Sequence, residues 1–306
     1  MPTIPDYPAH NRRALDAFMQ MLSPQQVDTP KKAARRWDQR AEFWQKERAK
    51  KRKGDERVFY ALSLLERRGI LTPDREVVDI GCGPGRFAAA FAKRVKRVLG
   101  LDISEKMVAH GQAYLVEQGL TNAVLQVCDF KTLDVEKAGL LGAFDLVFGS
   151  MTPAIHDMEG LLKSMSMSRA WCCNVTHLSG RNYMREQIMR DVFGQELPPQ
   201  WSGKWFYALF NTLFLLGYEP ETSYETRHSE IRVSAEEEYA AFITEHMLPE
   251  HMHTAENTAR ILDWLRAHVD EQGLITEISD TTYGTILWDV RRRTPRPSYD
   301  VPGSSF

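Results

Sequence analysis

The most informative segment of this chain is Val77-Val78-Asp79-Ile80-Gly81-Cys82-Gly83-Pro84-Gly85. An apolar run, typical of a buried strand, passes into three glycines at alternate positions and then into a segment with helical spacing. Glycine permits tight turns and lets a ligand lie against the backbone, where a Cβ would collide. A dinucleotide loop needs the spacing G-x-G-x-x-G, but Arg86 stands at its third glycine position. The segment therefore predicts a ligand-binding loop of a different kind.

The alternation of strand and helix continues outward from this loop. Apolar runs of strand length lie at residues 76–80, 97–101, 123–127, 144–148 and 170–175, and helical patterns at 87–95, 104–118 and 157–167. Strands that alternate with helices in this way predict βαβ units. We therefore expect an α/β fold, a doubly wound parallel sheet with helices on both faces. Right-handed crossovers place the carboxyl ends of the strands, and any ligand site, at one edge of the sheet.

The segments outside this core predict a helical extension and helical inserts. Residues 1–69 are interpreted as an N-terminal helical extension or lid, and residues 70–292 as the ligand-binding domain. Helical inserts are expected near 180–217 and 234–272, the second opened by Ser234 and Glu237 at capping-box spacing. Further strands are expected at 219–233 and 282–290. The polar residues 293–306 are expected to form a mobile tail.

Composition excludes several classes of protein. Of the 306 residues, 43% are hydrophobic and 26% are charged, and the formal net charge is -2, which is ordinary for a globular protein. The longest apolar run, residues 205–216, is interrupted by polar residues and is too short to span a bilayer. Four cysteines are too few for a disulfide framework. We therefore expect no membrane partner, reduced thiols and a cytoplasmic location.

A basic segment, residues 31–53, departs from this balance. It holds 11 Lys and Arg against 3 acids, a local net charge of +8, so the rest of the chain carries -10. Such a segment can contact RNA phosphates. A solvated helix face is the more common explanation, and the chain has no RNA-module signature. The sequence thus disfavours a nucleic-acid partner and leaves RNA as an alternative.

Four segments resemble, in order, the motifs of the class I S-adenosylmethionine (SAM) dependent methyltransferases. They are Asp79-Ile80-Gly81-Cys82-Gly83-Pro84-Gly85, Leu99-Gly100-Leu101-Asp102-Ile103-Ser104, Val127-Cys128-Asp129-Phe130 and Phe144-Asp145-Leu146-Val147-Phe148-Gly149-Ser150. The resemblance covers about residues 75–175 and, loosely, the last strand. It implies SAM as the cofactor and a mainly parallel, seven-stranded sheet of the class I methyltransferase type.

The resemblance also implies roles for residues in these motifs. The glycines would pass beneath the methionine part of SAM, and Asp79 would orient their loop. Asp102 would take the ribose hydroxyls, which one carboxylate can accept together, and would carry little structural load. Asp129 would meet the adenine amino group, although a plain turn is its alternative. The expected cofactor-binding residues are Asp79, Gly81, Cys82, Gly83, Gly85, Asp102, Ile103, Met107, Asp129, Phe130, Ser150, Met151, Trp37 and Trp44.

A tryptophan-containing helix is expected ahead of the core. Trp37-Asp38-Gln39-Arg40-Ala41 resembles a Trp-Asp-x-x-Ala element that forms a lid over SAM and substrate in many members of this family. Trp37, Ala41 and Trp44 share one helix face at i, i+4 and i+7. A lid and ordinary packing are both compatible with this stripe.

Candidate catalytic residues follow the fourth and fifth strands. His156 lies just past the fourth strand and could act as a general base toward an acceptor hydroxyl or thiol. Tyr183 and His177, after the fifth strand, are rivals. His246, His251 and His253 lie close together in sequence, but this segment is interpreted as an exposed loop, so we expect no metal. Because in-line positioning supplies much of the rate, a general base is not obligatory.

The acceptor is the least determined feature. Trp201, Trp205, Phe206, Tyr207, Phe210 and Phe214 put six aromatic residues into fourteen positions. One face of such a helix can dock on the core, and the other must meet something else. A pocket for a small apolar or aromatic acceptor and a homodimer interface are the two interpretations. An RNA or protein methyltransferase and a non-catalytic SAM-binding protein remain as alternative functions.

Overall fold

The computed structural model describes residues 11–22, 29, 31–35, 37–38, 56–197 and 200–297. The chain divides into two compact units. The first unit comprises residues 1–176, 203–223 and 284–306, and the second unit comprises residues 177–202 and 224–283. The predicted boundaries at 69/70 and 292/293 divide the chain along its sequence rather than into these spatial units, and they stay a prediction.

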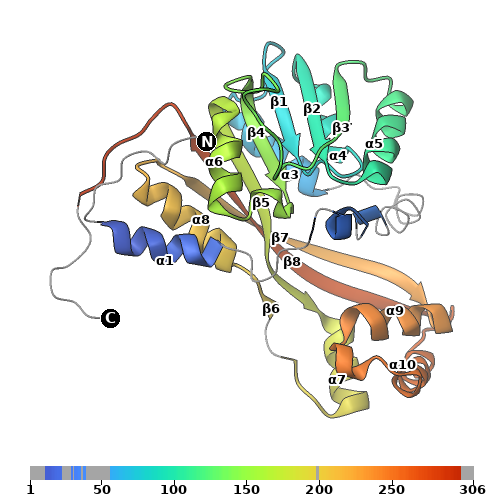
Figure 1. The fold of residues 1–306 in the computed structure, drawn as a ribbon. Helices are drawn as coiled ribbons and strands as arrows, with labels where there is room; N and C mark the ends of the chain where they lie inside the picture. Colours follow the sequence, from blue (N-terminus) through green and yellow to red (C-terminus); the bar gives the residue numbers. More distant parts are fainter. Residues whose placement is uncertain are drawn as a thin grey trace, which may run out of the picture. The chain divides into compact units, whose positions relative to one another are not determined.

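A mainly parallel sheet forms the frame of the protein (Figure 1). Its strand order is β3-β2-β1-β4-β5-β8-β7, and the short β6 (Gln200–Trp201) pairs with β5 off this path. Strands β1 to β5 pair in parallel wherever they are neighbours. Their bounds are Glu76–Ile80, Arg97–Asp102, Ala123–Val127, Phe144–Ser150 and Ser168–Asn182, with β7 at Glu221–Ser234 and β8 at Leu274–Asp289. The predicted doubly wound α/β fold is confirmed.

The helices of the first unit lie before, between and after its strands. They are α1 (Arg12–Leu22), α3 (Glu56–Arg67), α4 (Arg86–Ala92), α5 (Glu105–Glu117), α6 (Met158–Ser166) and α8 (Lys204–Leu215), with a 3₁₀ turn, η2, at Pro153–Ile155. Ser104 caps α5 by accepting a hydrogen bond from the Met107 N–H. Phe87 and Phe91 of α4 pack on Phe148 of β4, with ring centroids 4.7 and 5.0 Å away. These contacts hold the helix after the glycine loop against the strand that ends at the site.

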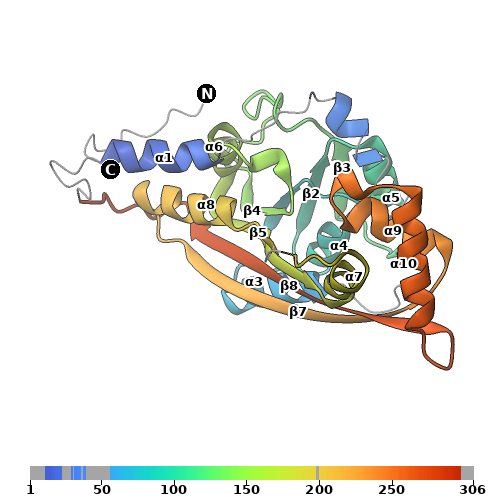
Figure 2. The ribbon, with the colours of Figure 1, turned by 90° about the horizontal axis from the view of Figure 1, so that it is seen from below.

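The aromatic helix α8 finds its second partner within the same chain. Figures 1 and 2 both show α1 alongside α8. The ring of Phe18 meets that of Tyr207 edge-on at 5.5 Å. The inner side of α8 is buried through Phe206, Leu209 and Leu213. The expectation that its outer side must meet a ligand or a second copy is therefore wrong where α1 covers it.

The residues after β8 are bound to α8, contrary to the expectation of a mobile tail. The Arg293 Nε donates to the Leu216 carbonyl at 2.6 Å, and the Arg296 Nη2 donates to the Tyr218 carbonyl at 2.6 Å. The Arg296 guanidinium lies 4.2 Å from the ring centroid of Phe214. The Arg296 Nε also donates to the Phe214 carbonyl at 3.0 Å, so the two arginines satisfy carbonyls that the end of α8 leaves free. Residues 298–306 of the expected tail lie outside the described residues.

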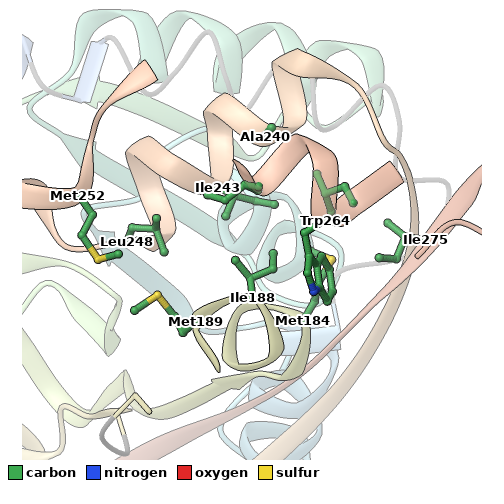
Figure 3. Close-up of a cluster of buried hydrophobic side chains, with 11 residues drawn as sticks. Met184, Ile188, Met189, Ala240, Ile243, Leu248, Met252, Trp264 and Ile275 are labelled. Atoms are coloured by element: carbon green, nitrogen blue, oxygen red, sulfur yellow. The ribbon is translucent and has the colours of Figure 1, made fainter. Parts of the chain in front are cut away.

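The second unit is built around a small helical core. It holds α7 (Tyr183–Phe193), α9 (Glu237–Met247), the 3₁₀ turn η3 (Glu250–Met252) and α10 (Ala255–Ala267). Figure 3 shows Ile188 of α7, Ile243 of α9 and Trp264 of α10 gathered in one apolar cluster. The helix expected to open at Ser234 begins at Glu237, after Glu236, and no side chain caps it. The capping box is therefore wrong, because Ser234 is still part of β7.

Two strands are longer than their apolar runs. The expected strand 170–175 continues as β5 to Asn182, and the expected strand 282–290 starts as β8 at Leu274. The extension of β5 is mostly polar, whereas that of β8 mixes apolar and polar residues, and both strands and β7 have residues in each of the two units. Of the residues that the structure describes, none form a helix long and apolar enough to cross a bilayer.

Candidate functional site

The glycine loop adopts a conformation that favours glycine at three positions. Gly81, Gly83 and Gly85 have φ angles of 71°, 51° and 74°, all in the left-handed region. The Gly81 N–H donates to the Leu101 carbonyl of β2 at 2.7 Å, which ties the loop to the neighbouring strand. The loop therefore sits at the carboxyl ends of β1 and β2, where the sequence predicts the ligand.

The surroundings of these glycines differ. A Cβ on Gly81 would lie 2.1 Å from Oγ1 of Thr152, the second residue after β4. A Cβ on Gly83 would meet no atom within 4 Å. Gly81 is thus required by the fold, because the loop after β4 packs against it. Gly83 faces open space, which a ligand can occupy.

Asp102 binds the loop as well as being available to a ligand. Its Oδ2 accepts the Gly83 N–H at 2.8 Å and its Oδ1 accepts the Ser104 N–H at 2.9 Å. Burial raises the pKa of Asp102, and these two backbone hydrogen bonds oppose the rise. Each oxygen keeps a lone pair for a hydroxyl. The expectation that this acid carries little structural load is wrong.

This double role yields a prediction for Asp102→Ala. We expect the unliganded variant to melt several degrees lower, since two charged hydrogen bonds to the backbone, each about 1.5–3 kcal/mol, are lost. Affinity for S-adenosylhomocysteine (SAH) should fall at least tenfold. Asp102→Asn, which keeps an acceptor oxygen, should recover part of the stability. Calorimetry and thermal denaturation measure both effects, and SAH binding equal to the parent would contradict the ribose role.

Asp79 is a buried acid with an unpaired oxygen. Its side chain is 1% exposed, and its Oδ2 has no hydrogen-bond partner among the residues described. Burial, followed by the nearby charge of Asp102, raises the pKa of Asp79 to about 8. Because this oxygen has no hydrogen bond to the glycine loop, it does not support the expected role of Asp79 in orienting that loop. A cationic or hydrogen-bonding part of a ligand would offset the free-energy cost of burying this unpaired oxygen. The adjacent Cys82 is buried, and burial raises the pKa of its thiol.

The remaining cofactor candidates gather around Asp102. The Cys128 N–H donates to the Asp102 carbonyl at 2.7 Å, which places Asp129 beside the same loop. The Asp129 carboxylate accepts the Lys131 N–H at 3.1 Å and so closes a local turn. Phe130 and Met107 are buried, and Ile103 is half-buried. These positions are compatible with an adenine pocket. The local turn at Asp129 is also compatible with the alternative that Asp129 belongs to a plain turn and contacts no ligand.

The N-terminal tryptophan element reaches the start of α5. Residues 31–35 and 37–38 are helical, and Trp37 is half-buried. The Asp38 carboxylate accepts a hydrogen bond from the Ser104 hydroxyl and another from the Lys106 N–H at 3.3 Å. Asp38 was not among the predicted site residues, although it is the second residue of the Trp-Asp element. Trp44 lies outside the described residues.

The end of β4 is strained. Met151 has a φ of 56°, the one positive φ outside glycine in the described part of the chain, and its side chain is 40% exposed. Its N–H donates to the Val175 carbonyl of β5 at 2.9 Å. Such strain costs about 1–3 kcal/mol and gathers at functional sites. Ser150 and Met151 therefore occupy a position consistent with facing the transferred group.

His156 follows directly on this strained turn. It caps η2, whose Ile155 side chain packs at Gly149, the penultimate residue of β4. The His156 ring lies 4.4 Å from the Trp205 ring, at an interplanar angle of 32°. Burial lowers the pKa of His156 to about 4, against a smaller opposing effect of Asp157. The imidazole is therefore neutral near pH 7 and can accept a proton.

Asn174 is a candidate site residue that the sequence analysis did not name. It lies on β5 in register with Gly149 and is 2% exposed. Neither its Oδ1 nor its Nδ2 has a partner among the described side chains and backbone. Leaving such an amide buried and unpaired costs free energy. A polar residue inside an apolar strand was the available signal, so Asn174 is a candidate for holding a ligand.

Tyr183, His177 and His253 have hydrogen-bond partners within the second unit. Tyr183 lies in the second unit, where its hydroxyl donates to Asp280 Oδ2 at 2.7 Å, and this bond raises its pKa. His177 is also in the second unit, paired with the Ser202 hydroxyl at 2.7 Å. The His253 ring binds the Leu248 carbonyl at 3.0 Å. Among the described residues no group of three His, Cys, Asp or Glu could hold a metal ion.

Comparison with known proteins identifies the domain that carries the glycine loop. Residues 77–168 match the family described as "Methyltransferase domain". This domain is a class I SAM-dependent methyltransferase domain. SAM is its cofactor. The match covers β1 to the start of β5 of this methyltransferase domain, which contain the loop, Asp102, Asp129 and His156.

Individual relatives of the methyltransferase domain differ in acceptor. The chain is 30% identical over 113 residues to a ubiquinone biosynthesis O-methyltransferase of Acinetobacter baumannii (strain AYE), covering 35% of this chain and 42% of the relative. It is 30% identical over 90 residues to a 23S rRNA (uracil(1939)-C(5))-methyltransferase of Alkalilimnicola ehrlichii, covering 29% of this chain and 19% of that relative. The chain thus spans less than half the length of these curated relatives.

A solved structure gives a further, remote likeness to the methyltransferase domain. The magnesium protoporphyrin IX methyltransferase from Synechocystis PCC 6803 with bound SAH is 18% identical, with a TM-score of 0.38, and the alignment covers 72% of this chain and 89% of that one.

The residues of the site fit SAM. The open space at Gly83, the free lone pairs of Asp102 and the unpaired oxygen of Asp79 each leave room or hydrogen-bonding capacity for part of the cofactor. SAM carries a positive ammonium and a positive sulfonium, and a cation bound beside Asp79 and Asp102 would favour the ionised form of these acids.

Proposed function

We propose that this chain is an enzyme that transfers the methyl group of SAM to a small acceptor with an apolar or aromatic body. The observation that supports this most is the pair of His156 and Trp205, whose rings lie 4.4 Å apart, tilted by 32°, beside the strained end of β4. Both residues are half-buried, and a flat aromatic acceptor can pack against the part of their rings that stays accessible. The free cysteines suit a cytoplasmic location. A homodimer stays a prediction.

The proposed reaction uses three groups of the first unit. When bound, SAM supplies an electrophilic methyl group. The neutral imidazole of His156 accepts the proton that an acceptor hydroxyl or thiol loses as its oxygen or sulfur forms the bond to carbon. The unpaired carboxamide of Asn174 can donate to and accept from a polar group of the acceptor. Trp205 orients the flat body, so that positioning contributes to the rate.

RNA is the second candidate acceptor. One matched relative is an rRNA methyltransferase, and residues 31–53 carry a net charge of +8. The ubiquinone O-methyltransferase relative favours a small molecule instead. Incubation with labelled SAM and either total RNA or a small-molecule extract separates the candidates. Label in RNA at physiological salt, with none in the small-molecule fraction, would overturn the proposal.

Substitution of His156 tests the proton acceptor. We expect His156→Gln to lower kcat about 10²–10⁴-fold with a hydroxyl or thiol acceptor, with SAH affinity unchanged. Because a protonated imidazole cannot accept a proton, parent activity should fall as the pH drops toward 4, whereas residual activity of the variant should lose that dependence. The exposed His251 supplies the control, since His251→Gln should behave like the parent. A His156→Gln variant with the parent's kcat and pH profile would remove His156 from the mechanism.

A further inference from the structure

A separate cavity lies wholly within the second unit. Its volume is about 550 Å³, within the range of small-molecule sites. It is lined by the end of β5, by α7, by the residues before β6 and by β8. Three arginines contribute to the lining: Arg181, Arg185 and Arg190. None of these residues belongs to the SAM site or to the proposed acceptor site.

The acids of this cavity are largely engaged. Arg181 donates to Glu186 from Nε and Nη2, each at 2.8 Å, so these two charges neutralise each other. Asp280 accepts the Tyr183 hydroxyl at 2.7 Å and binds the His228 ring at 2.8 Å. The remaining charges of the lining are the negative charge of the exposed Glu196 and the positive charges of Arg185 and Arg190, so positive charge is in excess.

Arg185 differs from the other two arginines in its surroundings. It is half-buried, and its Nε is buried without a hydrogen-bond partner among the residues described. Burial lowers the pKa of Arg185, although Glu186 acts in the opposite direction. The backbone N–H of Arg185 donates to the Asn182 Oδ1 at 2.9 Å, which fixes Arg185 in the first turn of α7. A guanidinium that is partly removed from water and unpaired costs free energy, which an anion would offset.

We propose that this cavity binds the oxyanion group, a carboxylate or a phosphate, of a small molecule, with Arg185 as its main partner. The planar guanidinium can donate two parallel hydrogen bonds to either group. The first turn of α7 adds a favourable dipole. Ser179 and Gln200, which also line the cavity, supply neutral donors. The proposal goes beyond methyl transfer and requires no SAM.

Three probes with the same ring test the charge requirement. Benzoate, phenyl phosphate and benzyl alcohol are titrated into the full chain at constant ionic strength, and binding is followed by NMR or calorimetry. We expect one or both anions to bind at least tenfold more tightly than benzyl alcohol, and the better anion identifies the group. Equal binding of all three probes would overturn the proposal.

Variants of two arginines in the same unit locate the site. Arg185→Gln should weaken anion binding at least tenfold, while Arg266→Gln, at an exposed position in the last turn of α10, should leave it unchanged. Without ligand, Arg185→Gln should melt at or above the parent, because an unpaired, partly buried charge is removed; a purely structural arginine would give a lower midpoint. Unchanged anion affinity in Arg185→Gln would overturn the assignment.

Two additional measurements keep the test decisive. Arg185→Lys keeps the charge but loses the planar fork, so it should bind the better anion at least threefold more weakly, and parent-like affinity would contradict the bidentate contact. SAH binding, measured on the same variants, should stay at the parent value. If the parent protein itself did not bind SAH, that result would count against the methyltransferase proposal and would leave the anion-site proposal standing.

Discussion

Replacing Asp79 by asparagine is expected to stabilise the unliganded protein at pH 8 and to weaken cofactor binding. Asp79 is buried with an unpaired oxygen, and its pKa rises from 3.8 to about 8. The folded state therefore holds a proton that the unfolded state releases between these pH values. The stability that this proton confers is complete below pH 3.8 and is lost as the pH rises to 8.

The size of the Asp79 effect follows from this shift. Four pKa units correspond to about 5 kcal/mol, and the amide of asparagine must also find partners, so we expect about 2–5 kcal/mol at pH 8. The melting temperature of Asp79→Asn should exceed that of the parent by about 5–15 °C at pH 8 and by little at pH 4. SAH affinity should fall at least tenfold.

Asp145 is the matched control for Asp79, because it is a buried acid with partners. It accepts hydrogen bonds from Arg169 Nη2 at 2.6 Å, the Glu76 N–H at 2.8 Å and Arg75 Nη1 at 2.9 Å. Burial alone would raise the pKa of Asp145, but these partners lower it to about 2. Asp145→Asn should therefore destabilise the protein at pH 8. If Asp79→Asn lowers the melting temperature as Asp145→Asn does, Asp79 is a structural acid.

Alanine at two of the loop glycines should separate folding from cofactor binding. Gly81→Ala places a Cβ 2.1 Å from Thr152 Oγ1 at a φ of 71°. Strain and overpacking together should cost about 2–5 kcal/mol. Gly83→Ala meets no protein atom within 4 Å, so only strain of about 1 kcal/mol is expected, yet SAH affinity should fall at least tenfold. Thermal denaturation and calorimetry report the two effects.

Gly139 provides the control for the loop glycines. It has a φ of 67°, and a Cβ at this position would meet no atom within 4 Å, so Gly139→Ala carries the strain alone. Its stability should resemble that of Gly83→Ala, with SAH affinity at the parent value. A Gly83→Ala variant that binds SAH as tightly as Gly139→Ala would show that the cofactor does not approach this loop.

The parallel sheet and the cofactor loop could be predicted because their signals are local. Glycines at 81, 83 and 85 and an acid at 102 each follow an apolar strand at close range in sequence. Parallel strands then bring those ends to one edge without further information. The same local signals place Asp129 just after β3, the neighbour of β2, and Ser150 at the end of β4, the neighbour of β1.

The missed features depend on contacts between distant residues. Asp38 binds Ser104, 66 positions away, and no local pattern marks that pair. The extension of β5 from Thr176 to Asn182 is polar, so hydrophobic periodicity does not reveal it. Asn174 is a polar residue inside an apolar strand, but that signal alone is weak, and its burial without partners among the described residues is what marks it as a candidate. The covering of α8 by α1 likewise required the tertiary structure, because amphipathicity does not name a partner.

The contacts around α8 have a consequence for synthesis on the ribosome. The Asn11 Nδ2 donates to the Pro297 carbonyl at 2.8 Å across 286 positions. At about 5–20 residues per second, the start of α1 waits about 15–60 seconds for this partner to be made. Leu15 and Leu22 of α1, buried in the finished fold, stay unprotected at least until α8, against which α1 packs, has been made. Slow translation of the central segment would therefore favour chaperone capture or aggregation of the nascent chain over completion of this layer.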